Sequence, residues 1–171
     1  MAASKRNKPA PPSPVVSNQK KIMAFIGQST DVDKLGSLVR NARAKGAVEL
    51  ADAAFRKLVS LVPAEKLGTV EYDFWQTVHA FEFTLSEERG KTTRLSRTRQ
   101  KVAKVGAVQI LADWATDAHP TDGFVKLVER GMPELTGEAV ALRHADRFAA
   151  PVLEAARRRL SEAGVDVAAL P

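Results

Sequence analysis

Apolar residues recur along this chain at the three- and four-residue spacing of an α-helix, and this periodicity is the feature that most limits its fold. In residues 69–88, for example, one stripe consists of Phe74, Val78, Phe81 and Leu85. No run of alternating apolar and polar residues is long enough to indicate a strand. The pattern therefore predicts an all-α protein.

Glycines and prolines divide the periodic sequence into separate helices. After a helical pattern that starts near Asn18, we expect helices over about 31–45, 47–62, 69–88, 93–105, 107–115, 120–130, 133–142 and 150–163. Because the connections between them are short, the sequence predicts a compact domain of about seven or eight short helices over residues 20–171.

The first 19 residues differ in composition from the rest. They contain Pro9, Pro11, Pro12 and Pro14, offer little apolar surface, and carry cations without an acid. Proline blocks helix and sheet hydrogen bonding, and a segment with little apolar surface gains little by burial. We therefore expect a disordered basic tail over residues 1–19, either an auxiliary arm for polyanions or a solubilising end.

Composition excludes several classes of protein. The 171 residues are 44% apolar and 27% charged, as in an ordinary globular protein, and none is cysteine. Disulfide frameworks, thiolate zinc sites and cysteine nucleophiles are therefore excluded. We expect no membrane span and no secretory signal, because no apolar run approaches about 18 residues and the N-terminus has no apolar core. A cytoplasmic protein is the expectation, and a homo-oligomer stays open.

Positive charge is concentrated in two short segments. Residues 1–21 carry five cations and no acid, and residues 89–104 carry seven cations and no acid. Since the whole chain has a net charge of +6, the remaining residues have a net charge of −6. A cluster of this kind produces a local potential that scattered charges do not. Residues 89–104 are called the basic segment below.

The basic segment begins with a fragment that resembles a phosphate-binding loop, Gly90-Lys91-Thr92. Such a loop needs a second glycine five residues earlier, where this chain has Leu85, and it should follow a buried strand. Here it follows a predicted amphipathic helix. Both requirements fail, so no nucleotide or other cofactor is assigned.

The basic segment is instead typical of a phosphate-contacting surface. A helix capped by Thr92 or Thr93 would place Arg94, Arg97, Lys101 and Lys104 on one face. Seven like charges repel one another, and a polyanion would remove that repulsion. The candidate contact residues are cations, hydroxyls and one amide: Arg89, Lys91, Thr92, Thr93, Arg94, Ser96, Arg97, Thr98, Arg99, Gln100, Lys101 and Lys104.

The sequence therefore predicts a DNA-binding protein that is not an enzyme and that contacts the phosphate backbone. Double-stranded DNA is favoured because the basic segment contains no aromatic residue on which single-stranded bases would stack. One alternative is a helical adaptor or regulator that docks an acidic protein. Another is that the chain's own acids neutralise the cations.

A metal-dependent nuclease is the third alternative. On the predicted helix 69–88, Glu71 and Glu82 are too far apart to share an ion, at about 16 Å along the axis. His79 and Glu82 form the only close pair of metal-ligating residues there, and one pair makes a poor metal site. We assign no catalytic residue and no metal.

Residues 121–144 resemble a helix-turn-helix in outline, but Gly137 interrupts the second helix, so two packed core helices are the favoured interpretation.

Overall fold

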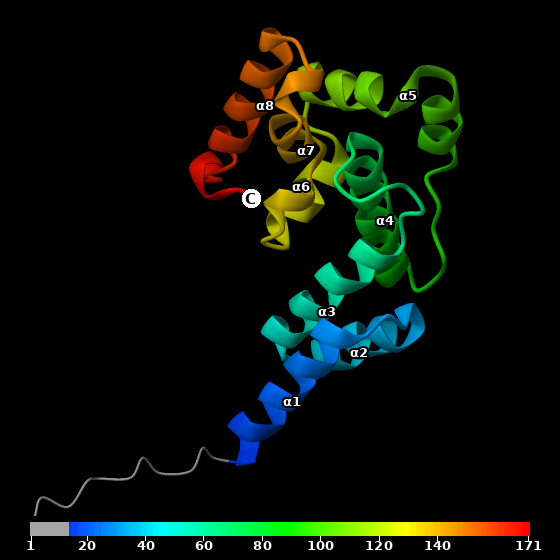
Figure 1. Cartoon of the computed structure of the whole chain (residues 1–171), viewed down its shortest axis with the longest axis vertical. Coiled ribbons are helices and arrows are strands. Elements are labelled where there is room, and N and C mark those ends of the chain that lie inside the picture. The colour runs from blue at the N-terminus through cyan, green and yellow to red at the C-terminus, as the bar shows by residue number, and fades with distance from the viewer. Residues whose placement is uncertain (1–13) are drawn as a thin grey trace, which may run out of the picture. The chain divides into compact units, whose positions relative to one another are not determined.

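The computed structural model describes residues 14–171, with side chains from residue 18 onward. In that range the chain forms eight α-helices and three short 3-10 helices, and no strand (Figure 1). This confirms the predicted all-α fold. In chain order the elements are α1 (Pro14–Gln28), α2 (Val32–Ala44), α3 (Val48–Leu61), α4 (Val70–Arg89), α5 (Ser96–Thr116), α6 (Asp122–Glu129), η1 (Pro133–Leu135), α7 (Gly137–Arg143), η2 (Ala145–Arg147), α8 (Ala150–Glu162) and η3 (Val167–Ala169).

The first helix, α1, begins at Pro14, within the segment that composition assigns to a tail. Proline is tolerated in the first turn of a helix because its missing N–H would have no partner there. The rest of the predicted tail, residues 1–13, lies outside the described residues, and so do its cations.

The chain divides into two compact units, residues 1–58 and 59–171. The sequence predicts one helical domain over residues 20–171. Whether the two units act as one domain stays a prediction. All twelve candidate contact residues belong to the second unit.

In the first unit, α2 and α3 each bury apolar side chains. The side chain of Asp31 caps α2 by accepting a 2.9 Å hydrogen bond from the backbone N–H of Lys34. Leu35 and Val39 on α2 and Phe55 on α3 are fully inaccessible to solvent.

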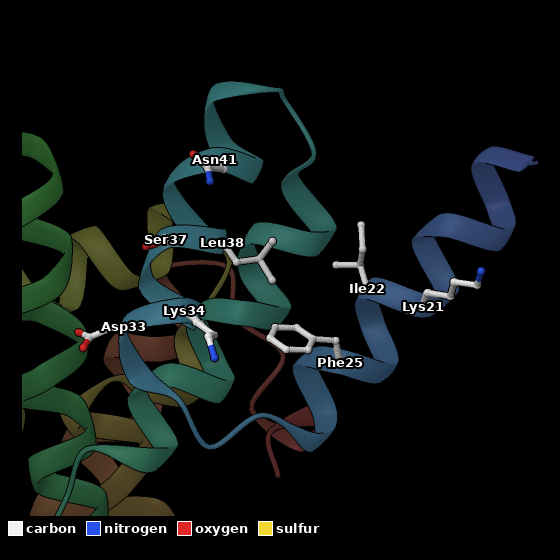
Figure 2. Close-up of a pocket in the computed structure, with 8 residues that line it drawn as sticks. All are labelled: Lys21, Ile22, Phe25, Asp33, Lys34, Ser37, Leu38 and Asn41. Carbon is white, nitrogen blue, oxygen red and sulfur yellow. The ribbon is translucent and has the colours of Figure 1, made fainter.

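A groove of about 560 Å³ lies between α1 and α2 in the same unit. Figure 2 shows the ring of Phe25 directed from α1 toward Leu38 of α2. Phe25 is 46% exposed. The groove therefore leaves an aromatic ring in contact with solvent.

In the second unit, α4, α5 and α7 bury their apolar faces against one another. Phe74 and Val78 of α4, Ile110 and Leu111 of α5 and Val140 of α7 belong to one cluster of buried side chains. The core extends through α8, which packs against both α5 and α7 (Figure 1). The remaining helix, α6, packs against α4.

Helix α7 lies inside this core, and the close packing around its first residue, Gly137, explains why a glycine stands there. A Cβ atom on Gly137 would lie 2.7 Å from Cε3 of Trp114, closer than the packing permits. Every residue from Gly137 to Ala141 is buried. A recognition helix must reach a DNA groove, so the helix-turn-helix outline of residues 121–144 corresponds to packed core helices.

Two glycines define the ends of the predicted helices around the basic segment. Gly90 ends α4 in the left-handed conformation, as the sequence predicts. Gly106, with φ of 81° and ψ of 165°, breaks α5 into two halves, 96–105 and 107–116. Only glycine adopts this conformation without strain.

No helix in residues 14–171 is long and apolar enough to cross a membrane.

Candidate nucleic-acid interface

The basic segment starts at the last residue of α4, continues through the connection 90–95 and ends in the first half of α5. The predicted capping by Thr92 or Thr93 is wrong, because α5 begins at Ser96 and the residue before it, Leu95, supplies no side-chain cap. Arg94 consequently lies in the connection and not on a helix face.

Hydrogen bonds to α4 explain why the helix starts late. The backbone N–H of Thr93 donates to the hydroxyl of Ser86 at 2.8 Å, and that of Leu95 donates to Oε1 of Glu82 at 2.7 Å. Both N–H groups are thus held against α4 and the connection runs along that helix. The Thr93 hydroxyl donates to the carbonyl of Lys91 at 3.2 Å instead of capping a helix.

Glu82 is the main anchor of the basic segment. Its carboxylate is 7% exposed and accepts two hydrogen bonds from Arg99, at 2.9 Å from Nε and 2.7 Å from Nη2. Burial alone would raise the pKa of Glu82, but hydrogen bonds from Arg99, His79 and the Leu95 N–H outweigh burial and lower the pKa to about 2. The Glu82 carboxylate is therefore charged at neutral pH.

Arg99 is held on a second side by an aromatic ring. Its guanidinium carbon lies 4.9 Å from the ring centroid of Trp75. With a bidentate carboxylate and an indole around it, Arg99 serves the structure of the second unit. It is not free to contact a ligand.

Lys101 is also paired within the chain. Its Nζ lies 2.5 Å from Oδ2 of Asp113, across the break at Gly106, and Gln109 donates to the other oxygen at 2.8 Å. The hydrogen bond from Lys101 is the largest cause of the lowered pKa of Asp113. This pair connects the two halves of α5.

Besides Arg89, four of the seven cations are exposed and, among the residues that the structure describes, form no ion pair. They are Lys91 and Arg94 in the connection and Arg97 and Lys104 on α5. Arg97 and Lys104 are two helical turns apart and therefore share a face. Arg89 is exposed beside Glu88 and contributes to the lowered pKa of that carboxyl, for which the hydrogen bond from Lys126 is the largest cause.

The hydrogen-bonding members of the predicted set are divided between surface and interior. Thr92, Ser96 and Gln100 are exposed, whereas Thr93 and Thr98 are partly buried. Ser96 lies at the uncapped N-terminus of α5, where backbone N–H groups have no helical partner and add partial positive charge. Exposed cations, exposed polar side chains and a helix N-terminus thus share one stretch of surface.

The structure does not assemble the alternative metal site. His79 lies 3.6 Å from Glu82, where the carboxylate is already occupied by Arg99. Over the described part of the chain, no three His, Asp or Glu side chains are grouped so that they could hold a metal ion.

Sequence reasoning missed the partners of two buried acids. Asp73 accepts from His144 at 2.8 Å and from Arg143 at 3.0 Å. Glu138, 1% exposed, accepts from Arg159 at 2.9 Å. The acids lie 70 and 21 residues from these arginines. No local sequence spacing connects each acid with its arginine. Only the apolar neighbours of Asp73 and Glu138 in sequence could have indicated that these acids are buried and need partners.

Comparison with protein-family models, with curated proteins and with solved structures finds no match.

Proposed function

We propose that this protein binds double-stranded DNA through the phosphate backbone, with the exposed cations of the basic segment as the contacts and without catalysis. The observation that carries the proposal is that Lys91, Arg94, Arg97 and Lys104 are exposed and form no ion pair with the described residues. Phosphate oxygens are the partners that such a cluster binds most favourably.

The anchoring of the segment supports this proposal. Glu82 and Ser86 fix the connection 90–95 to α4, so the exposed cations project from a held backbone and not from a loose loop. A binding surface that is already ordered loses less entropy on association. Arg99 and Lys101 hold the segment in place, because they form ion pairs with Glu82 and Asp113.

The binding mode should depend on charge and not on base sequence. The segment contains no aromatic residue, and the ring of Trp75, which it contacts, has Arg99 over its face. Base stacking of single strands therefore has no platform here. Phosphate contacts position a protein on DNA without reading its bases.

The test is a salt titration with a fluorescent duplex of arbitrary sequence, followed by anisotropy. The logarithm of the binding constant should fall with the logarithm of salt concentration by about 0.9 per phosphate contacted. Replacing Arg94, Arg97 and Lys104 by Gln should lower the magnitude of this slope by about 2.7.

A matched control removes the same charge elsewhere. Arg147, Arg157 and Arg158 are exposed residues of the same unit, outside the basic segment, and replacing them by Gln changes the net charge equally. The slope should then change much less. Equal effects of the two triple variants would mean that net charge alone governs binding. An absence of duplex binding at physiological salt would refute the proposal and favour an acidic protein partner.

A further inference from the structure

A second feature of the same unit points to a small ligand. A partly enclosed cavity of about 200 Å³ lies among α4, α5, α6 and the start of α7. Cavities of about 150 Å³ with apolar walls take up benzene. The space is therefore large enough for a single small ring.

Three aromatic rings form part of the walls. Phe81 of α4, Trp114 of α5 and Phe124 of α6 each contribute a ring. Gly123 and Gly137 also line the cavity but have no side chains to fill it. A Cβ atom on Gly123 would lie against Phe81, and one on Gly137 would lie against Trp114. A planar apolar guest matches walls of this kind.

The polar groups of the lining favour a ligand that donates a hydrogen bond. The Thr121 hydroxyl accepts from the N–H of Phe124 at 3.1 Å and keeps its own hydrogen for donation, whereas the carboxylate of Asp122, an exposed residue of the lining, can only accept. Thr98 also lines the cavity, and no residue in the described part of the chain hydrogen-bonds to its hydroxyl. A ligand O–H or N–H can therefore donate to the Asp122 carboxylate or to the Thr98 hydroxyl.

An ion of either sign loses hydration when it enters a cavity with a largely apolar lining. The carboxylate of Asp122 disfavours an anion. A cation would find only the exposed Asp122 carboxylate as a partner in the lining, and such a pair in contact with solvent is weak. From these observations we propose that the cavity binds a small, uncharged, planar aromatic molecule that carries one O–H or N–H donor. This proposal is independent of DNA binding.

Phenol, benzylamine and benzoate share one ring and differ in charge, so they are suitable probes for nuclear magnetic resonance of the ¹⁵N-labelled full chain. Trp114 lines the cavity and Trp75 does not, which provides an internal control. Phenol should shift the indole N–H resonance of Trp114 saturably, with a Kd on the order of 1 mM or lower, and leave that of Trp75 in place. The two charged probes should bind at least about tenfold more weakly, a difference of about 1.4 kcal/mol.

Two variants make the test decisive. Thr98→Leu should fill the cavity and remove the phenol response, whereas Gln100→Leu, an exposed position on the same helix, should retain it. Asp122→Asn keeps the shape of the side chain and should bring benzoate closer to phenol in affinity. The proposal is overturned by an unsaturable response, by equal shifts of both tryptophans, or by benzoate binding that ignores Asp122→Asn.

Discussion

Replacing Glu82 by Gln tests how the basic segment is held. Glu82 is 7% exposed, and its pKa of about 2 lies well below the 4.5 of an ordinary glutamate. That difference corresponds to about 3 kcal/mol of stabilisation at neutral pH. Removing one charge from a buried ion pair costs a similar amount, about 3–5 kcal/mol. Because glutamine can still accept from the Leu95 N–H, we expect a loss near the lower value.

The loss should depend on pH in a specific direction. A carboxyl whose pKa is lowered by folding stabilises the protein fully above its unfolded pKa, here near 4.5, and that contribution disappears as pH falls toward about 2. The variant has no carboxyl to protonate at this position. Wild type and Glu82→Gln should therefore differ fully at pH 7 and progressively less between pH 4.5 and 2.

Urea unfolding followed by tryptophan fluorescence measures this difference. Trp75 and Trp114 both lie in the second unit, as Glu82 does. The control is Glu88→Gln, which removes an exposed pair with Lys126 at 2.7 Å and should cost less than about 1 kcal/mol. The reasoning is refuted if both variants cost the same at pH 7, or if the loss caused by Glu82→Gln persists undiminished near pH 2.

Two further variants test packing and burial. Gly137→Ala should lower the free energy of unfolding by about 1–3 kcal/mol, because its Cβ would meet an indole ring at 2.7 Å. Gly27→Ala, with nothing within 4 Å of its Cβ, should not destabilise, and thermal unfolding followed by circular dichroism compares them. Arg159→Leu should cost about 3–5 kcal/mol because it leaves the carboxylate of Glu138 buried alone. Since burial raises the pKa of Glu138, lowering the pH from 7 should recover part of that loss as the carboxyl is protonated. A loss independent of pH would contradict this account. Arg158→Leu, at an exposed position, is the control.

The helices were predictable because their signals are local. Apolar spacing places the stripe of α4, and Gly90 and Gly106 stop helices through backbone conformations that other residues avoid. These signals act within a few residues of one another, so the sequence displays them directly. The start of α5 was mispredicted because the backbone N–H groups of Thr93 and Leu95 bond to side chains of α4, which are distant in sequence.

The state of the basic segment was only partly predictable. Its cations are visible as a block, but their partners Glu82 and Asp113 are 17 and 12 residues away from Arg99 and Lys101. One sign was present in the sequence: Glu82 lies between Phe81 and Phe83 on a strongly apolar helix, and a buried carboxylate requires a partner. Which cation supplies it depends on how α4 and α5 pack.

The measurement that tests the central claim most directly is amide chemical-shift mapping of the ¹⁵N-labelled protein with a short duplex at low salt. We predict that the resonances of residues 91–97 and of Lys104 shift first and return as salt is added, while those of the buried helix α7 stay in place. Shifts that leave the basic segment untouched, or that persist at high salt, would contradict the claim.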